Sequence, residues 1–372
     1  MANSLPHSVD VLVVGLGPAG GSAALMAAKA GLTVLGVDRK KQAGMPVQCA
    51  EFIPLPMSQY AAEAPIRTQT IAGMKTYLPS GKKEVTDFPG LMINRQKFDE
   101  AIANKAVQAG AHVVFGATLQ SLDRANKVAR IGLDTGSINV SYRYVVAADG
   151  PHSIVAKNLG LPPLKIVNTR QYTVPLLKPF ADTDIWVSDE FPGGYAWLFP
   201  KGDWANLGLG ADKRFEQDLK APLDKLHKQL VDQGVVGEEI TYRTGGAIPV
   251  GGMREQLVIE NSYLFAGDAA GLTHPITGAG ISAAVQSGEW AGQAVAKMIA
   301  GDEAALEDYE DEVRDQYEVT LSRAIEKREW LENIWHTQHA NEDEIMRVGW
   351  IAFDEYFKSA PNVVKNLQDV AI

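Results

Sequence analysis

Three glycines near the amino terminus have the spacing of a phosphate-binding turn. Gly15, Gly17 and Gly20 form the pattern G-x-G-x-x-G directly after the apolar run 9–14. The first glycine permits a tight turn, the second lets the backbone approach a pyrophosphate, and the third lets a helix pack closely on a strand. The start of that helix presents free N–H groups and the positive end of its dipole. The pattern therefore predicts a dinucleotide-binding site.

An acidic residue follows where a ribose-binding carboxylate is expected. The second apolar run, 33–37, ends at Asp38. This residue lies about 20 residues beyond the glycines, and its carboxylate can accept hydrogen bonds from ribose hydroxyls. A glycine pattern between a strand and a helix, with an acid at this distance, is a strong signal. It does not distinguish NAD from FAD.

Two later segments favour FAD. Each has the pattern of a strand that ends in an acidic residue beside a glycine, first at Asp149-Gly150 and again at Gly267-Asp268. An NAD domain needs no second loop of this kind. The ribityl chain of a flavin carries hydroxyl groups that a carboxylate such as Asp268 can bind. We therefore expect FAD as the cofactor.

The segment after Asp268 has a second feature that suits a flavin. It contains Pro275 and then, from about Gly278, a long predicted helix rich in small residues. The positive end of this helix would face the flavin edge that carries negative charge in the reduced form. The alternative is that Asp268 only caps the helix.

The order of the predicted elements brings these residues together. The predicted fold class is α/β, with a Rossmann-like FAD-binding domain, a mostly antiparallel substrate-binding sheet and a helical C-terminal region. Strand-like segments at 70–92, 169–191 and 239–250 would form the second sheet, covered by an amphipathic helix at 215–232. We expect a discontinuous FAD-binding domain at 1–69, 93–165 and 251–301, a substrate domain at 70–92 and 166–250, and helices at 302–372.

The helical C-terminal region is acidic at first and then aromatic. The simplest expectation is that its helices pack on the FAD-binding domain. The alternatives are a cap over a lipid tunnel and a docking face for a partner.

An aromatic stretch, FPGGYAWLFP at 191–200, places Tyr195, Trp197 and Phe199 at the strand period of two. Such a stripe can be the core face of a sheet. It can also form the wall of an apolar pocket for a long or planar substrate.

Three residues near the predicted flavin site carry groups that could take part in chemistry. Cys49 could contact the flavin, protonate a substrate carbon, or pack as a small apolar residue. Glu51 could be a proton source or simply lie exposed. His274 could contact flavin or substrate, or hydrogen-bond within its own loop.

The glycine and aspartate motifs resemble those of the p-hydroxybenzoate hydroxylase superfamily of flavoproteins. The segment at 93–111 is similar to that superfamily's Arg-x-x-Phe-Asp motif, with Arg95 and Phe98-Asp99 opening a helix. The resemblance covers most of the chain before the C-terminal region. It implies that Arg95 belongs to the cofactor-binding residues.

Two stretches are similar to the geranylgeranyl reductase family, which saturates isoprenoid double bonds. The stretch PVQCAEFIP at 46–54 resembles that family's cysteine-containing loop near the flavin, with Ala50 where glycine is often found. The aromatic stretch fits the family's Y-x-W-x-F-P motif. The resemblance implies a FAD-dependent oxidoreductase with Cys49, Tyr195 and Trp197 in its active site.

Two chemistries remain open at this point. In an alkene reductase, reduced flavin would deliver a hydride to one carbon, and Cys49 or water would supply a proton. In a hydroxylase (monooxygenase), the reduced flavin would react with dioxygen and attack an aromatic ring. That ring could belong to a small molecule, or to a tryptophan or tyrosine of a partner protein during quinone-cofactor maturation. A flavin-binding module without catalysis is a third interpretation. The electron donor would be NAD(P)H or a redox protein.

Composition excludes several classes of protein. The net charge of −10 argues against a nucleic-acid partner. No apolar run of about 20 residues predicts a transmembrane segment, which leaves peripheral membrane contact open. The single cysteine and the absence of a signal-like start predict a cytoplasmic protein. Glu332, His336 and His339 have helical spacing, but no further ligand cluster supports them, so we expect no metal site.

Overall fold

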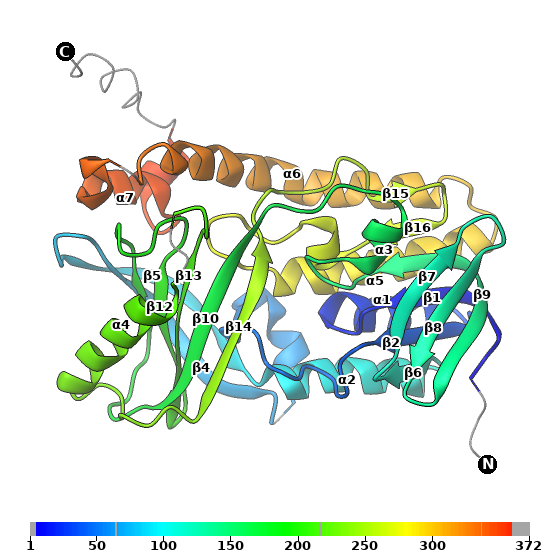
Figure 1. Cartoon of the computed structure of the whole chain (residues 1–372), viewed down its shortest axis with the longest axis horizontal. Coiled ribbons are helices and arrows are strands. Elements are labelled where there is room, and N and C mark those ends of the chain that lie inside the picture. Colours follow the sequence, from blue (N-terminus) through cyan, green and yellow to red (C-terminus); the bar gives the residue numbers. More distant parts are fainter. Residues whose placement is uncertain (1–4, 64, 216–217, 336, 359–372) are drawn as a thin grey trace.

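Two sheets lie at opposite ends of an elongated molecule in the computed structural model, which describes residues 5–63, 65–215, 218–335 and 337–358 (Figure 1). Each sheet has eight strands. The chain passes from the first sheet to the second and back more than once, so segments far apart in sequence meet between the sheets.

The first sheet has the parallel centre of a Rossmann-like domain. Val11, Val13 and Val145 on its central strands are fully buried, as expected of strands covered on both faces. The strand order is β15-β16-β9-β1-β2-β6, and β8 and β7 continue from β9. The strands are β1 (Ser8–Val14), β2 (Val34–Asp38), β6 (His112–Phe115), β7 (Thr118–Asp123), β8 (Val128–Leu133), β9 (Gly136–Ala147), β15 (Val258–Ile259) and β16 (Tyr263–Phe265).

The helices beside the first sheet pack closely because small residues line their contact. A Cβ atom on Gly288 would lie 2.1 Å from the Ala19 carbonyl oxygen, and one on Gly292 would lie 2.5 Å from the Ala23 carbonyl oxygen. Glycine at both positions therefore lets α5 approach α1. The helices are α1 (Pro18–Lys29), α2 (Arg95–Gln108), α3 (Ile154–Asn158) and α5 (Ile281–Ile299), with the short 3-10 helix η2 (Gly267–Ala270) before α5.

The second sheet is mostly antiparallel, with β4 and β11 as a parallel pair. Its order is β14-β10-β13-β12-β11-β4-β5-β3, and helix α4 (Lys220–Asp232) packs on one face through Leu223, Leu226 and Leu230. The strands are β3 (Phe52–Pro54), β4 (Arg67–Tyr77), β5 (Lys83–Ile93), β10 (Ile166–Pro175), β11 (Thr183–Trp186), β12 (Ala196–Lys201), β13 (Trp204–Ala211) and β14 (Tyr242–Pro249), and the 3-10 helix η1 (Leu55–Ala61) follows β3.

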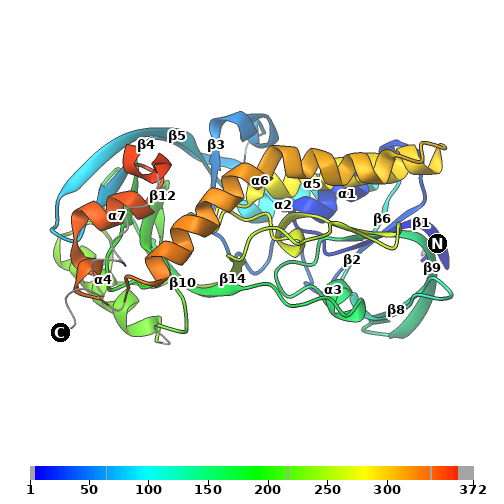
Figure 2. The same ribbon diagram turned by 90° about the horizontal axis from the view of Figure 1, so that it is seen from above.

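The C-terminal region, here residues 305–358, joins the two sheets. Figure 2 shows α6 (Ala305–Glu332) running along the molecule from the first sheet to the second. Its first half packs with the first sheet through Tyr309 and Val313, and its end packs with the second through Leu331. The remaining elements are η3 (Gln338–Asn341), α7 (Asp343–Gly349) and η4 (Asp354–Phe357).

The aromatic residues of the C-terminal region do not follow the simplest expectation. Trp335, Trp350 and Phe353 are buried against Met74 and Ile185 of the second sheet. The expectation that these helices pack on the FAD-binding domain therefore holds only for the first half of α6. The reason is the length of α6, which carries the following residues past the first sheet.

The predicted fold class is confirmed: an α/β fold with a Rossmann-like domain, a mostly antiparallel sheet and C-terminal helices. Three details differ. Helix α4 begins at Lys220 and α5 at Ile281, later than the predicted starts at 215 and about Gly278. Strand β3, placed by sequence with the FAD-binding domain, pairs instead with β5 of the second sheet.

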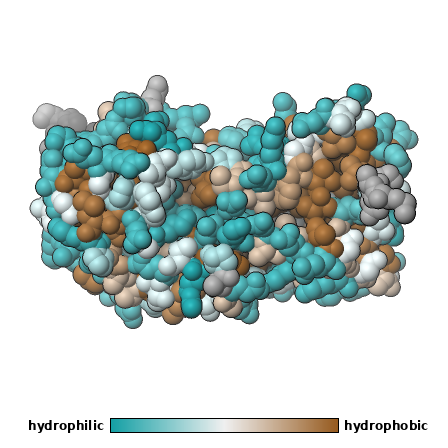
Figure 3. Space-filling model, turned by 90° about the horizontal axis from the view of Figure 1, so that it is seen from below, coloured by the Kyte–Doolittle hydropathy of each residue, from teal (hydrophilic) through white to brown (hydrophobic). Residues whose placement is uncertain are grey.

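The face of the molecule in Figure 3 is mostly hydrophilic, with hydrophobic areas separated by polar residues. Among the helices that the structure describes, we find none whose length and apolar content would let it span a bilayer.

Candidate functional site

The glycine turn after β1 leaves open space where a pyrophosphate would lie. Gly15 has φ +90° and donates its N–H to the Val37 carbonyl at 2.8 Å. A Cβ atom on Gly20 would collide with the Gly15 carbonyl, whereas one on Gly17 would meet no atom within 4 Å. Helix α1 begins at Pro18 without a side-chain cap. The turn is thus shaped by Gly15 and Gly20, and Gly17 faces free space at the helix start.

Two carboxylates lie at the ends of β2 and β9, the two strands that flank β1. Asp38, at the end of β2, accepts hydrogen bonds from the N–H groups of Leu16 and Lys40, both at 2.8 Å. It therefore holds the glycine turn, and its remaining lone pairs can accept ribose hydroxyls. Asp149 follows β9 and accepts from the Ile154 N–H at 2.6 Å through Oδ2. Its Oδ1 is buried and has no partner among the described residues.

Asp268 follows β16 and lies beside the loop at 271–280. Its Oδ1 accepts a hydrogen bond from the Thr273 hydroxyl at 2.5 Å. Burial raises the pKa of Asp268, and Thr273 and the charge of Arg95 partly offset this rise. The N-cap of α5 is Gly280, which has no side-chain cap. Asp268 therefore does not cap α5, and the free N–H groups of α5 face the same loop.

These features meet at one edge of the first sheet. Strands β1, β2, β9 and β16 are parallel neighbours, so their carboxyl ends lie together, which is where open α/β sheets bind ligands. The edge offers two uncapped helix starts, partly free carboxylates and an orphaned buried oxygen. This set of groups fits the diphosphate and hydroxyl groups of FAD.

Arg95 and Cys49 lie beside this edge. Arg95 opens α2 and forms an ion pair with Asp99, with both nitrogen–oxygen distances at 2.9 Å. Burial would lower the pKa of Arg95, but Asp99 and the neighbouring Cys49 raise it. Cys49 is half-buried, and its Sγ accepts the Glu51 N–H at 3.2 Å. The arrangement places a thiol next to a guanidinium.

Glu51 is not exposed, contrary to one interpretation of its sequence position. Its side chain is 2% exposed. It accepts hydrogen bonds from the Arg95 N–H at 2.8 Å, from Lys201 at 2.5 Å and from Asn206 at 3.0 Å. Glu51 therefore fixes the Cys49 loop between α2 and the second sheet, and its use as a proton source stays a prediction.

Tyr195 and Trp197 occupy different positions. The Tyr195 hydroxyl donates to the Thr277 carbonyl at 2.5 Å, and its ring lies 4.8 Å from that of Trp350. Burial, followed by the charge of Cys49, raises the pKa of Tyr195. Trp197 is 6% exposed and donates its indole N–H to Gln171 at 3.1 Å. Tyr195 thus faces the loop at 271–280, whereas Trp197 lies in the sheet's core.

Gln171 links this core to the Cys49 loop. It is buried, accepts from Trp197, and donates to the Cys49 carbonyl at 3.1 Å. The sequence gives only a weak signal for Gln171, an uncharged polar residue within an otherwise strand-like run.

A cavity of about 30 Å³ lies where the second sheet, the loop at 271–280 and the C-terminal region meet. Its wall is mainly aromatic and aliphatic. The lining residues include Tyr195, Ile276, Arg328, Trp335, Met346 and Trp350.

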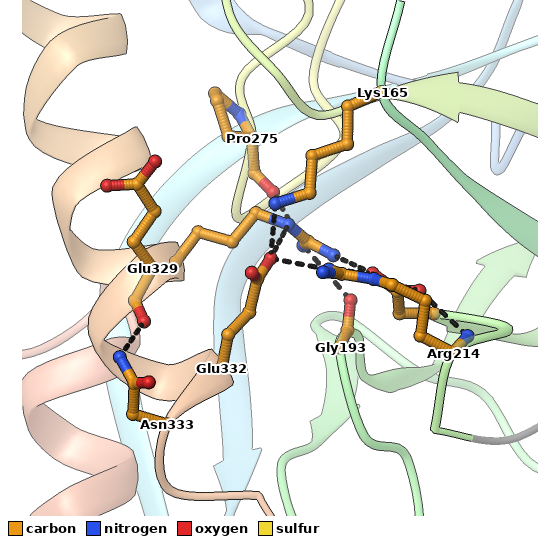
Figure 4. Close-up of polar contacts among 9 residues, drawn as sticks. Lys165, Gly193, Arg214, Pro275, Glu329, Glu332 and Asn333 are labelled. Carbon is orange, nitrogen blue, oxygen red and sulfur yellow. Dashed lines mark hydrogen bonds and ion pairs between the residues drawn. The ribbon is translucent and has the colours of Figure 1, made fainter.

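Arg328 of α6 holds the three parts of this wall together, and Figure 4 labels two of its partners, Gly193 and Pro275. It is 3% exposed, and its Nη1 donates to the carbonyls of Gly193 at 3.0 Å and Pro275 at 3.2 Å. Its Nη2 donates to Asp212 at 3.3 Å. A single buried guanidinium therefore contacts the aromatic stretch, the loop at 271–280 and Asp212, the residue that follows β13.

The remaining candidates have structural partners. His274 accepts the N–H groups within its own loop through Nδ1, and burial lowers its pKa to about 4. Glu332 pairs with Lys165 at 2.7 Å and with Arg328. His336 lies outside the described residues, and His339 pairs with a glutamate. Within the described part of the chain, no group of three or more His, Cys, Asp or Glu side chains could hold a metal ion.

Comparisons with known proteins identify the family of the chain. Residues 70–294 match the family described as FAD dependent oxidoreductase. The chain is 34% identical to digeranylgeranylglycerophospholipid reductase 2 of Methanopyrus kandleri over 338 residues, which is 85% of each chain.

Solved structures show the same fold. A geranylgeranyl bacteriochlorophyll reductase-like protein from Thermoplasma acidophilum superposes with a TM-score of 0.82 at 27% identity, covering 98% of this chain and 100% of the other. A probable FAD-dependent monooxygenase from Pseudomonas aeruginosa gives a TM-score of 0.67 at 19% identity, with 88% and 97% covered, and shares the fold alone. The chain belongs to the FAD-dependent oxidoreductase family, and its cofactor is FAD.

Proposed function

We propose that this protein reduces carbon–carbon double bonds of a long apolar, isoprenoid-type substrate. The observation that carries the proposal is the 34% identity, over 85% of both chains, to a protein named as a digeranylgeranylglycerophospholipid reductase. The apolar and aromatic wall beside the loop at 271–280 supports it. The hydroxylase alternative has only the shared fold in its favour, because that similarity lies below 20% identity.

The groups at the edge of the first sheet would hold FAD, which supplies a hydride to a double bond when it is bound and reduced. The N–H groups at the start of α1 would bind the diphosphate. The residues we assign to cofactor binding are Gly15, Gly17, Gly20, Asp38, Arg95, Asp149, Gly267, Asp268, Pro275 and Gly278. This assignment, and placement in the p-hydroxybenzoate hydroxylase superfamily, belong to the proposal.

Cys49 would supply the proton. Saturation of one double bond adds a hydride to one carbon and a proton to the other. Two electrons per bond come from NAD(P)H or a redox protein. The thiol of Cys49 would give up its proton, and the adjacent Arg95 would stabilise the resulting thiolate. Gln171 would orient the Cys49 loop through its hydrogen bond to the Cys49 carbonyl. The thiolate would then regain a proton from solvent.

Substrate access requires the C-terminal region to move. The cavity of about 30 Å³ is far smaller than the pockets of about 300–1,000 Å³ that hold small-molecule ligands. Trp335 and Trp350 belong to the part of the wall that follows α6, so we propose that they move aside. We also infer that the protein acts in the cytoplasm and meets its lipid substrate by peripheral contact with a membrane.

Product analysis tests the proposal. The FAD-loaded protein, reduced chemically under nitrogen, is incubated with a digeranylgeranyl phospholipid. We expect mass spectrometry to show products that gain two hydrogens for each double bond reduced. Products that gain oxygen when air is admitted, with no hydrogenated lipid under nitrogen, would contradict the proposal.

A further inference from the structure

A second pocket lies on the second sheet, outside the cavity described above. It has a volume of about 390 Å³ and is bordered by β10, the edge strand β14 and the start of α4. Three basic side chains line it: Arg170, Lys220 and Arg243. The basic side chains of this pocket contrast with the net charge of −10 of the whole chain.

The two arginines converge on one aromatic ring. The guanidinium of Arg170 lies 5.7 Å from the ring centroid of Tyr172, and that of Arg243 lies 5.8 Å from the same centroid. Tyr172 and Arg243 are opposite each other in the β10–β14 register, and Arg170 is two residues away on the same face. Within the described part of the chain, neither arginine forms an ion pair. Both guanidinium groups therefore lie within 6 Å of the same ring centroid.

The neighbouring acidic groups do not neutralise both arginines. Asp224 accepts the Tyr172 hydroxyl at 2.7 Å and also pairs with Lys220. Burial opposes ionisation of Asp224, but hydrogen bonds from Lys220 and Tyr172, together with the charge of Arg170, lower its pKa. Asp218 accepts the Lys220 backbone N–H at 2.8 Å. Among the residues that the structure describes, these three basic and two acidic side chains leave one positive charge in excess.

One residue that lines the pocket is hydrogen-bonded to the Cys49 loop. Gln48, the residue before Cys49, donates its side-chain N–H to the Gly245 carbonyl at 2.5 Å, and Gly245 lines the pocket. Gln171, the residue after Arg170, donates to the Cys49 carbonyl. The two strands that border the pocket are therefore hydrogen-bonded to the loop that carries the proposed proton donor.

We propose that this pocket binds a phosphate or diphosphate group of a ligand of the reaction. Paired guanidinium groups suit phosphate oxygens, because each can donate two parallel hydrogen bonds. The pocket's volume is that of a small-molecule site, so the phosphate is part of a larger molecule. Two sources share this chemistry: a phosphorylated head of the apolar substrate, and the phosphates of a nicotinamide donor. Phosphate binding itself does not rest on the proposed function, whereas the choice of source does.

Calorimetric titration with inorganic pyrophosphate tests the site without an activity assay. We expect saturable binding to the FAD-loaded protein, weakened at least tenfold by Arg170→Ala combined with Arg243→Ala. Arg130→Ala, on β8 of the other sheet, is the matched control and should bind as the wild type does. Arg243→Gln alone changes an exposed position, so it should weaken pyrophosphate binding less than the double variant does. Its melting temperature checks that the fold is kept. No binding to the wild type, or equal binding to the double variant, would overturn the site.

Steady-state kinetics then identifies the source. A higher KM in the double variant for a phosphorylated prenyl lipid, with an unchanged KM for the prenyl alcohol, identifies the substrate head. A higher KM for NADPH, with dithionite-driven reduction unchanged, identifies the donor. If both KM values stay at wild-type level, the pocket does not serve a ligand of this reaction and the proposal fails. A protein that reduces no lipid at all would refute the proposed function but leave the pyrophosphate result to decide the site.

Discussion

The two sheets build their binding surfaces in different ways. In the first sheet, the groups that suit FAD follow directly after parallel strands, and most are backbone N–H groups or aspartates that sit next to a glycine. In the second sheet, the cavity wall combines side chains from the aromatic stretch, the loop at 271–280 and the C-terminal region. The first surface depends on local chain geometry, whereas the second depends on contacts between distant segments.

This difference has a functional consequence. Backbone groups that bind a diphosphate suit many reactions, and the FAD-binding surface says little about the substrate. Under the proposed function, the second surface is where chemistry would be selected, because Tyr195 lines it and lies near Cys49, the neighbour of Arg95. Substitutions in the FAD-binding surface should therefore change cofactor binding. Substitutions in the cavity wall and the Cys49 loop should change turnover or stability.

The largest effect is expected at the glycine turn. Gly17→Val should abolish FAD binding, because the added side chain would fill the space left for the pyrophosphate while meeting no protein atom within 4 Å at Cβ. Flavin absorbance of the purified variant measures this directly. Gly17→Ala should cause a smaller loss, and full FAD content in the valine variant would show that the diphosphate lies elsewhere.

Cys49→Ala should separate turnover from cofactor binding. Loss of a general acid typically costs about 10²–10⁴-fold in rate, so we expect a fall of that order in product formation. Reduction of the bound flavin by the donor should continue, as should FAD binding. Rapid-mixing absorbance and product mass measure the two steps. Undiminished product formation would assign the proton to water.

Arg328→Met should destabilise the contact between the C-terminal region and the second sheet. Asp212 and Glu332 would keep Arg214 as a partner. The carbonyls of Gly193 and Pro275 would lose their donor, which costs about 1–3 kcal/mol for each buried group left unsatisfied. Denaturant unfolding of the FAD-loaded protein gives the change. Arg323→Met is the control on the same helix: it loses one contact with the Phe357 ring, worth about 1 kcal/mol or less. Equal losses in the two variants would contradict the role of Arg328.

Asp268→Ala should weaken FAD binding about tenfold to a hundredfold, because a hydrogen bond to a charged group contributes roughly 1.5–3 kcal/mol. Titration of the apoprotein with FAD measures the affinity. Asp134→Ala, in the exposed β8–β9 turn, is the control for loss of one negative charge. An affinity equal to that of the control would remove Asp268 from the cofactor site.

The smallest effect is expected from Trp197→Phe. It removes the indole N–H that binds Gln171 at 3.1 Å, which should lower the unfolding free energy by roughly 1–2 kcal/mol. Trp204→Phe, at a position 41% exposed, should change stability little. If Trp197→Phe raises the KM for substrate without any loss of stability, Trp197 contacts substrate. The assignment of Trp197 to the core of the second sheet would then be wrong.

The sequence predicts the FAD-binding surface of the first sheet better than the contacts around the second sheet, for a physical reason. The positions of Gly15, Asp38, Asp149 and Asp268 follow from strand ends and turn geometry, which short stretches of sequence encode. The burial of Glu51 depends on Lys201 and Asn206, more than a hundred residues away in the chain. Such contacts have no local signal.

The C-terminal region shows the same limit. Its helices are evident in the sequence, but the sheet that they cover is not. Arg328 lies in a charged helical stretch, and no local pattern separates it and the equally buried Lys327 from the exposed Glu326 and Glu329 beside them. The length of α6 decides its partner, because the helix carries Trp335 and Trp350 beyond the first sheet to the second.

Flavin reoxidation without oxygen tests the central claim most directly. The FAD-loaded protein is reduced under nitrogen, mixed with an isoprenoid lipid, and followed by the absorbance of oxidised flavin in a single turnover. The account predicts that the absorbance returns under nitrogen as the electrons pass to the double bond. A flavin that stays reduced with the lipid, and is reoxidised only when oxygen is admitted, would contradict it.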